Sequence, residues 1–417
     1  MTAAGIERLS FYGGQACVDV RELAAHRGLD IKRFDNLMMQ EKTVALPHED
    51  PVTYAVNAAR PIIETLTAED QESIELLITC TESGIDFGKS LSTYVHEHLG
   101  LKRHCRMFEV KQACYSGTAG LQTAVNFIAS RTSPGARALV ICTDLSRFLL
   151  IGDGEAMSMD WAFAEPSGGA GAVAMLIGEQ PGVFAVDLGA SGYYGYEVMD
   201  TCRPVPDSEA GDADLSLMSY LDCCEQTFAA YEQRVESDYR RSFQYLAFHV
   251  PFGGMVKGAH RKMMRRFGRS SPAEIDLDFE QRVLPGLQYG QRVGNIMGGS
   301  LYLALAGLID SGQFETPKRI GCFSYGSGCA SEFFSGVVTP AGQRSQHQLR
   351  LADSLALRRK LTMAEYDAIL ADGHTVKFGT RNVTLPPGHI GMGRDGDSHR
   401  YLALKEIKQF HRIYEWQ

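Results

Sequence analysis

Three residues with reactive side chains stand at the ends of short apolar runs. Cys114 lies between an apolar lead-in containing Phe108 and Val110 and a run of small residues, Glu82 follows IELLIT, and His249 lies in YLAFHV. Such runs predict buried strands, and a polar group at the carboxyl end of a strand can face a cleft. A thiol, a carboxyl group and an imidazole are the nucleophile, base and acid that thioester chemistry requires.

Each of these residues also has a simpler structural interpretation. The N–H groups at a helix start lower the pKa of a thiol, yet local geometry alone favours a packed core cysteine at position 114. Glu82 alone would be a solvated loop acid, or a base of raised pKa if an apolar cleft holds it. A lone histidine at a strand end, such as His249, is more often structural. Only the three side chains together favour catalysis.

Two glycine-rich segments add candidate binding groups. Asn295 in RVGNIMGGS would either cap the following helix or hydrogen-bond a substrate carbonyl group. In SYGSG, the N–H groups of Gly326 and Ser327 would face a developing oxyanion, or the segment is only a tight turn. Local pattern leaves both interpretations open for both segments.

The elements that must position these groups alternate between strands and helices. Apolar runs predict strands over residues 74–79, 138–144, 171–178, 245–250 and 319–326. Helical patterns cover residues 50–66, 116–130, 216–235 and 294–310. Asp50 and Pro51 suit the cap and first turn of the first helix. Unbroken apolar strands between helices favour an α/β fold with buried, largely parallel sheets.

The two halves of the chain show a faint internal echo. CYSGTAGLQTA precedes the Gly-rich PSGGAGAVAMLIG in the first half, and GNIMGGSLYLALA precedes SYGSGCASEFFSGVV in the second. Gly-rich strand starts are common, so the echo alone does not establish a duplication. No flexible linker separates the halves, which favours one compact body.

Composition excludes several classes of function. The formal net charge of -9 argues against general nucleic-acid binding. The amino-terminal residues lack a signal-peptide pattern, and no run reaches the roughly 18 apolar residues of a membrane span, so we expect a cytoplasmic protein without membrane association. The ten cysteines include no CxxC pair, and we expect no bound metal.

Five blocks, taken together, resemble the 3-hydroxy-3-methylglutaryl (HMG) synthases of the thiolase superfamily over nearly the whole chain. They are TESGIDFGKS, QACYSGTAGLQTA, FHVPFG, GNIMGGSLYLAL and SYGSG. Other stretches, such as YYGYEVMDTCRPVPDSEAGDADLSLMSYLDCCEQTF, look like the HMG synthases that install β-branches on polyketides and take acyl groups from carrier proteins. The resemblance implies a homodimer with the thiolase fold, a duplicated, layered αβαβα architecture of the α/β class. Its halves would be residues 1–180 and 181–417.

The resemblance places the family's catalytic triad on Glu82, Cys114 and His249. It implies that Cys114 takes an acetyl group from a donor thioester and that Glu82 removes a proton from the acetyl methyl group. The enolate would attack the β-ketone of a carrier-bound acyl chain, while His249 would orient this acceptor and protonate the alkoxide. The N–H groups of Cys114 and Ser327 would bind the oxyanion. Hydrolysis of the Cys114 thioester would leave a carboxymethyl branch.

The resemblance also assigns further site residues and the form of the substrates. Asn295 would hold the acceptor thioester carbonyl group, and Asp144 and Asp200 match aspartates near the family's active site. The acyl groups would arrive on phosphopantetheine, from a donor acetyl-acyl carrier protein and from an acceptor carrier protein of a polyketide synthase. No tightly bound cofactor is implied.

Two positions depart from the coenzyme A enzymes of the family. Phe148 stands where those enzymes carry a tyrosine near the active site, so its hydroxyl group is missing here. Gly253 and Gly254 stand where they tend to have a lysine close to the coenzyme A phosphates, and the first lysine in this chain is Lys257. Both changes weaken the case for coenzyme A as the natural carrier.

One segment is strongly basic in this acidic chain. Residues 257–269 hold Lys257, Arg261, Lys262, Arg265, Arg266 and Arg269. If the segment is helical, cations three and four residues apart share a face. A charged helix face is normally just solvated, but carrier proteins are typically acidic. This face, and the smaller pair Lys32 and Arg33, are therefore candidate docking surfaces.

Three alternative functions remain open. A mevalonate-pathway HMG-CoA synthase, using acetyl-CoA and acetoacetyl-CoA, would share the fold and triad and differ in its acetyl donor. A ketoacyl-carrier-protein synthase of the Cys-His-Asn type would use Asn295 but leave Glu82 unexplained. An inactive thiolase-fold scaffold that binds carrier proteins would not need all three reactive residue types.

Overall fold

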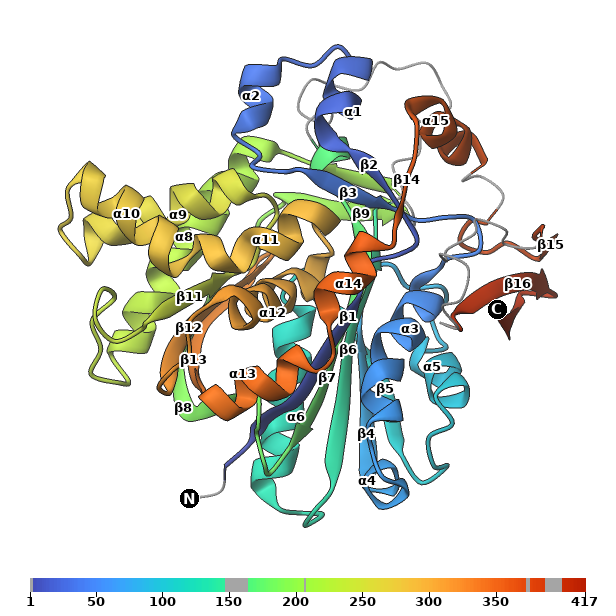
Figure 1. Ribbon diagram of the computed structural model, residues 1–417, viewed down its shortest axis with the longest axis horizontal. Helices are drawn as coiled ribbons and strands as arrows, with labels where there is room; N and C mark the ends of the chain where they lie inside the picture. The colour runs from blue at the N-terminus through green and yellow to red at the C-terminus, as the bar shows by residue number, and fades with distance from the viewer. Residues whose placement is uncertain (1–2, 147–163, 206–207, 373–375, 387–399) are drawn as a thin grey trace.

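Nine strands among the described residues form one mixed sheet through the centre of the protein (Figure 1). The computed structural model describes residues 3–146, 164–205, 208–372, 376–386 and 400–417. In spatial order the strands are β11 (Tyr245–Phe248), β12 (Lys318–Gly326), β13 (Ala330–Val338), β8 (Phe184–Gly195), β1 (Gly5–Tyr12), β7 (Ala170–Gly178), β6 (Arg137–Leu145), β4 (Ile74–Cys80) and β5 (Arg106–Val110). Every strand predicted from an apolar run belongs to this sheet.

The strand order repeats one pattern in two halves. From the centre outwards, one side reads β1, β7, β6, β4 and β5, and the other reads β8, β13, β12 and β11. In each half the first strand along the chain lies innermost, next to the last strand, and β1 pairs antiparallel with β8. The Gly-rich strands of the internal echo, β7 and β13, therefore occupy equivalent places. The predicted duplicated α/β architecture is confirmed, while the division at residue 180 stays a prediction.

Helices form the middle and the two outer layers. The middle helices are α6 (Ser116–Ser130) and α12 (Ser300–Ser311). They share one hydrophobic core with strands of both halves, and the Thr118 and Tyr302 hydroxyl groups meet there at 2.9 Å. The outer helices on one side are α3 (Pro51–Glu64) and α5 (Ser92–His98), and on the other side α8 (Ala213–Glu232), α9 (Gly253–Arg266) and α10 (Pro272–Arg282) (Figure 1).

The directions of strand pairing correct one prediction. The parallel pairs are β4–β5, β4–β6 and β11–β12, whereas β1–β7, β1–β8, β6–β7, β8–β13 and β12–β13 are antiparallel. The expectation of largely parallel sheets was therefore wrong. Helices bury both faces of this sheet, so an antiparallel strand such as β7 is as uniformly apolar as a parallel one.

The predicted helices form, with differences at their ends. The Asp50 carboxylate caps α3 by accepting from the N–H groups of Val52 and Thr53, both at 3.0 Å. Helix α6 has the predicted bounds, and α8 begins and ends three residues earlier than predicted. The fourth region divides into the 3₁₀ turn η1 (Met297–Gly299) and α12. Asn295 therefore lies just before a tight turn and not in a helix.

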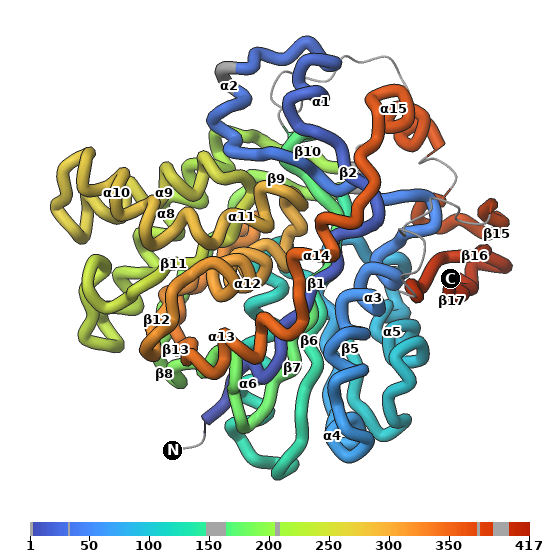
Figure 2. The backbone as a smooth tube through the Cα atoms, in the orientation of Figure 1, coloured from blue at the N-terminus to red at the C-terminus, as the bar shows by residue number. Residues whose placement is uncertain are grey.

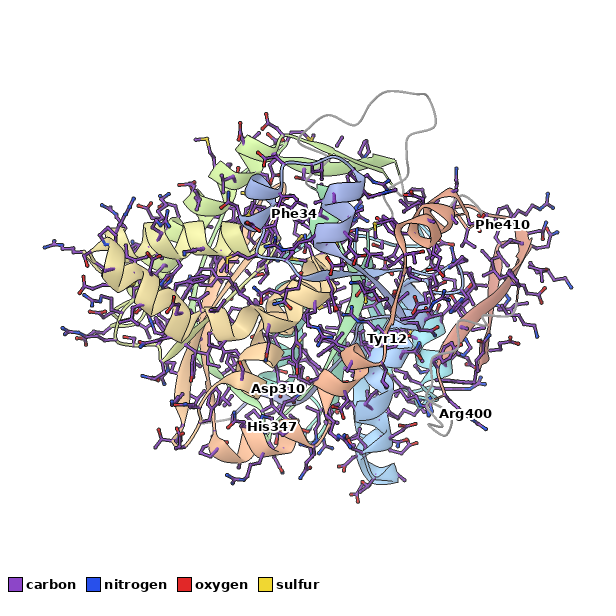
Figure 3. All side chains as sticks on the ribbon, turned by 45° about the horizontal axis from the view of Figure 1, so that its top comes forward. Tyr12, Phe34, Asp310, His347, Arg400 and Phe410 are labelled. Atoms are coloured by element: carbon purple, nitrogen blue, oxygen red, sulfur yellow. The ribbon has the colours of Figure 1, made fainter. Side chains whose placement is uncertain are left out.

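Smaller elements surround this body (Figure 2). They are β2 (Ala16–Asp19), α1 (Val20–His26), α2 (Ile31–Asp35), β3 (Glu41–Val44), α4 (Ala68–Glu72), β9 (Thr201–Val205), β10 (Ser208–Gly211), α11 (Leu284–Val293), α13 (Pro340–His347), α14 (Leu351–Ala356), β14 (Arg359–Lys360), α15 (Met363–Asp372), β15 (Asn382–Thr384), β16 (Leu402–Lys408) and β17 (His411–Trp416). Asp310 on α12 and His347 on α13 lie side by side, with 3.7 Å between a carboxylate oxygen and Nε2 (Figure 3).

Within the described ranges, every helix is too short or too polar to span a bilayer.

Candidate active site

A cavity of about 1560 Å³ brings together the three predicted catalytic residues and two of the predicted binding residues. Its lining includes Glu82, Cys114, His249, Asn295 and Ser327. These residues come from five segments that are far apart in the sequence, and the ends of β4, β5, β11 and β12 bring four of them to one place. The strand-end pattern therefore located a real cluster of reactive side chains.

Other predicted residues do not reach the cavity surface. Gly326, Asp144 and Asp200 are buried and lie outside its lining. Phe148 lies outside the described residues. Asp144 and Asp200 instead accept hydrogen bonds from segments that carry cavity residues, and so hold those segments in position.

Cys114 sits in the turn between β5 and α6, close to the start of that helix. Ala113 before it has φ +44°, a conformation that residues other than glycine rarely adopt. The Cys114 sulfur lies 3.4 Å from Oε1 of Glu82. Burial, with the charges of Glu82 and Asp144, raises the pKa of the Cys114 thiol well above its usual value. The expectation that the helix start lowers this pKa was wrong, because burial of the thiol, together with two carboxyl groups from other strands, raises it.

Asp144 fixes the turn that carries Glu82. One oxygen of its carboxylate accepts hydrogen bonds from the N–H groups of Glu82 and Ser83, at 2.9 and 3.0 Å, and from the hydroxyls of Thr81 and Ser83. Burial and the charge of Glu82 raise the pKa of Asp144 to about 7. Its contacts orient the Glu82 backbone, so its place in the site is to position that residue.

Arg203 is a site residue that sequence patterns did not reveal. It lines the cavity from β9 and forms ion pairs with Glu82 at 3.5 Å and with Glu209 of β10 at 2.7 Å. Burial raises the pKa of Glu82, and Arg203 opposes that rise. The only local signal was a basic residue three positions after Asp200 in VMDTCRP. That signal does not identify a partner more than a hundred residues away.

His249 follows β11 and is almost fully buried. Its backbone N–H group donates to the carbonyl oxygen of Phe323 at 2.7 Å, and its backbone carbonyl oxygen accepts from the Tyr220 hydroxyl at 2.7 Å. Burial lowers the pKa of the imidazole to about 3. Its Nδ1 has no hydrogen-bond partner among the described residues. The side chain is therefore a neutral imidazole near pH 7, suited to donating a hydrogen bond.

Asn295 lines the cavity and also holds the tight turn that follows it. Its Oδ1 accepts from the Met297 N–H group at 3.0 Å and from the Ser300 hydroxyl at 2.8 Å. These bonds fix the start of the 3₁₀ turn η1 and are not a cap of helix α12, whose N-cap residue is Gly299. No hydrogen bond engages its Nδ2 within the described part of the chain, and the residue lines the cavity. The amide N–H groups are therefore free to bind a substrate carbonyl group.

The SYGSG turn packs directly against the Cys114 turn. A Cβ atom at Gly326 would lie 2.4 Å from the Tyr115 backbone nitrogen, so only glycine permits this approach. Asp200 accepts from the Tyr325 hydroxyl at 2.5 Å and from the Gly328 N–H group at 2.9 Å. Asp200 thus holds the turn whose Ser327 reaches the cavity.

The basic segment forms helix α9, at the edge of the cavity. Arg261, Arg265 and Arg266 are exposed on it. Lys257 pairs with Asp276 at 3.3 Å, and Arg266 with a glutamate of α8 at 3.2 Å. Among the described residues, Arg261 and Arg265 have no ion-pair partner, so their charges face solvent.

Helix α2, which carries Lys32 and Arg33, adjoins the start of α9 (Figure 2). The N–H group of Gly253 donates to the Leu37 carbonyl oxygen at 3.0 Å. A Cβ atom at Gly254 would lie 1.9 Å from the carbonyl oxygen of Asn36. Gly253 and Gly254 therefore permit a close contact between these segments.

Comparison with known proteins agrees with this geometry. The family model of the hydroxymethylglutaryl-coenzyme A synthase N terminal matches residues 2–182, and that of the C terminal matches residues 273–412. The polyketide biosynthesis 3-hydroxy-3-methylglutaryl-ACP synthase PksG of Bacillus subtilis (strain 168) is 62% identical over 418 residues, which cover 100% of both chains. The hydroxymethylglutaryl-CoA synthase of Enterococcus faecalis is 34% identical over 374 residues, 88% of this chain and 91% of that protein.

Solved structures agree with the sequence relatives. The curacin biosynthetic pathway HMG synthase, in a crystal structure with holo donor-ACP, has a TM-score of 0.95 and 62% identity, with 100% of both chains covered. An identity this high over the full length, together with family matches to both halves, goes beyond a shared fold. The chain therefore belongs to the hydroxymethylglutaryl-coenzyme A synthase family.

Proposed function

We propose that this chain is an HMG synthase that uses acyl carrier proteins and installs β-branches on polyketide intermediates. The observation that carries the proposal is the 3.4 Å contact between Cys114 and Glu82, in a cavity that His249 and Asn295 also line. A thiol beside a carboxyl base suits acyl transfer followed by enolate formation. Two relatives support the carrier-protein form, since PksG is named an HMG-ACP synthase and the curacin enzyme was crystallised with its donor ACP.

The first half of the reaction loads and activates the acetyl group. The Cys114 sulfur attacks the donor thioester; because burial keeps the thiol protonated, Glu82 takes its proton and returns it to the departing phosphopantetheine thiolate. Glu82, ionised again, removes a proton from the acetyl methyl group. The N–H groups of Cys114 and Ser327 hold the negative oxygen of the enolate.

The second half forms the branch. The enolate carbon adds to the β-ketone of the acceptor, whose thioester carbonyl group binds Asn295 Nδ2. The neutral imidazole of His249 donates a hydrogen bond to the resulting alkoxide and passes it a proton, and the proton that Glu82 took from the acetyl group restores the imidazole. Water then cleaves the Cys114 thioester, which releases the thiol and leaves a carboxymethyl branch on the carrier-bound chain. Asp144 and Asp200 hold the turns that carry Glu82 and Ser327.

The proposed reaction takes place between two carrier proteins. Both acyl groups travel on phosphopantetheine, without a tightly bound cofactor, from a donor acetyl-carrier protein to a second carrier of a polyketide synthase. The enzyme acts as a homodimer in the cytoplasm. The Gly253 and Gly254 pair supports the carrier protein over coenzyme A only through the resemblance, which places a lysine of the coenzyme A enzymes at this position.

Acetyl transfer tests this function directly. The protein is mixed with acetyl-carrier protein or with acetyl-CoA, and intact mass follows the gain of one acetyl group. We expect faster labelling from the carrier protein and none on Cys114→Ala. Efficient labelling from coenzyme A alone would favour a mevalonate-pathway enzyme, and no labelling from either donor would favour the inactive scaffold.

Helix α9 provides the docking prediction. Arg261→Glu combined with Arg265→Glu should slow acetyl transfer from the acidic carrier roughly tenfold at low salt, because both charges face solvent and can steer the partner. Transfer from a small acetyl thioester should not change. Steady-state rates with both donors, over a range of salt concentrations, provide the measurement.

A matched variant controls for net charge in the docking experiment. Arg131→Glu with Arg350→Glu changes the charge equally at exposed positions outside α9, where the side chains are 60% and 78% exposed. This pair should react normally with both donors. Equal loss on the carrier and on the small thioester in the α9 variant would contradict docking there.

A further inference from the structure

Arg203 reaches Glu82 from a separate part of the chain. Its Nη1 donates to the Glu82 carbonyl oxygen at 3.1 Å and to the Ser83 hydroxyl at 3.2 Å, while Nη2 donates to Glu209 at 2.7 Å. Its Nε lies 3.5 Å from Oε2 of Glu82 and makes no hydrogen bond within the described residues. One guanidinium group therefore holds the backbone of residue 82 and faces its carboxylate.

The other groups around Glu82 are acidic. Asp144 on β6 binds its N–H group, Glu209 on β10 lies on the far side of Arg203, and the Cys114 thiol touches its carboxylate. In the part of the chain that the structure describes, Arg203 is the one cation within ion-pair distance of Glu82. The reaction adds negative charge here, first as an enolate and then as a carboxylate. A cation at this place stabilises the charges that form.

The geometry also leaves Glu82 able to act as a base. A bidentate arginine pair would engage both carboxylate oxygens and lower their affinity for a proton. Arg203 instead makes its hydrogen bonds to the Glu82 backbone, to Ser83 and to Glu209, so that Oε1 of Glu82 remains directed at Cys114.

We propose that Arg203, held in place by Glu209, is a positioning residue that aims the Glu82 carboxylate at the acetyl group on Cys114 and balances its charge. This inference rests on the proposed function, in which Glu82 removes the acetyl proton. Arg203 acts through Glu82 and its turn, and it needs no contact with the substrate to do so.

Hydrogen exchange in the acetyl group tests this role. Cys114 is loaded with acetyl, the enzyme is moved into deuterated water, and peptide mass spectrometry follows deuterium uptake at the methyl group between about pH 5 and pH 9. In Arg203→Met, acetyl loading should stay within about threefold, while exchange near pH 7 falls roughly tenfold or more. Because the variant loses a cation beside Glu82, the acid limb of the profile should move to higher pH. Arg203→Lys should regain part of the rate, and Glu209→Gln should lose less than Arg203→Met.

A second arginine supplies the matched control. Arg319 on β12 pairs with Asp187 at 2.7 Å outside the cavity, so Arg319→Met removes an arginine–carboxylate ion pair, a more exposed one, away from the chemistry. Its exchange profile should match that of the native protein. Unchanged exchange in Arg203→Met, or an equal loss at every pH, would overturn the positioning role.

A readout without any carrier protein separates this inference from the proposed function. Burial raises the pKa of the Cys114 thiol and Arg203 opposes that rise, so Arg203→Met should slow alkylation of Cys114 by iodoacetamide at a given pH. Slower alkylation together with no acetyl loading of the native protein would support the charge role of Arg203 and overturn the proposed function. Unchanged alkylation would overturn the role of Arg203, whatever the donor experiment gives.

Discussion

Glu82→Gln is expected to stop carbon–carbon bond formation while acetyl-Cys114 still accumulates. The amide keeps the shape of the side chain but cannot take the methyl proton, so condensation should fall roughly 10²–10⁴-fold, the contribution typical of a general base. Acetyl loading should slow by less, since excess donor drives the thioester to completion. Intact mass of the enzyme and of the acceptor carrier, followed over time, measures both steps in one reaction.

Glu49→Gln provides the comparison for Glu82→Gln. Glu49 is also buried, with a pKa that burial raises to about 7, and accepts from the Tyr12 and Tyr54 hydroxyls at 3.1 Å, outside the cavity. Its loss should affect stability without separating loading from condensation. Condensation by Glu82→Gln within about tenfold of the native rate would rule out Glu82 as the base.

The strands that could be predicted are those buried on both faces. Runs such as ALVICTD in β6 stay apolar because helices cover each side of the sheet. The edge strand β5 reads RMFEV, half exposed and interrupted by charges, so its only local signal is the short apolar lead-in with Phe108 and Val110. Whether neighbouring strands run parallel or antiparallel could not be predicted either. This depends on how distant segments connect and not on the polarity of each strand.

The reactive residues were predictable because each has a local signature. Cys114, Glu82 and His249 end apolar runs, and in one sheet such ends converge. Arg203 has no such signature, since its role depends on a hairpin that brings it to a residue from a distant strand. The predicted direction of the Cys114 pKa shift was wrong for the same reason. It depends first on burial of the thiol and then on carboxyl groups that only the folded chain places beside it.

His249→Gln should retain far more condensation activity than His249→Ala. The imidazole is neutral above about pH 4, because burial lowers its pKa to about 3. It therefore works as an N–H donor of constant charge near neutral pH, as in other enzymes that use a neutral histidine, and an amide can replace part of that function. We expect His249→Ala to lose roughly 10²-fold or more and His249→Gln to recover at least part of this.

The pH dependence of condensation gives the sharper test of His249. A group with a lowered pKa stays deprotonated as the pH rises through neutrality, so the native single-turnover rate should show no loss from His249 between about pH 5 and pH 8. An imidazolium acid would instead lose activity as the pH rises through its pKa. The measurement mixes preformed acetyl-enzyme with the acceptor carrier at each pH. A falling limb in the native protein that His249→Gln abolishes would show that His249 acts in its charged form. Burial opposes that form, because Nδ1 has no hydrogen-bond partner among the residues that the structure describes.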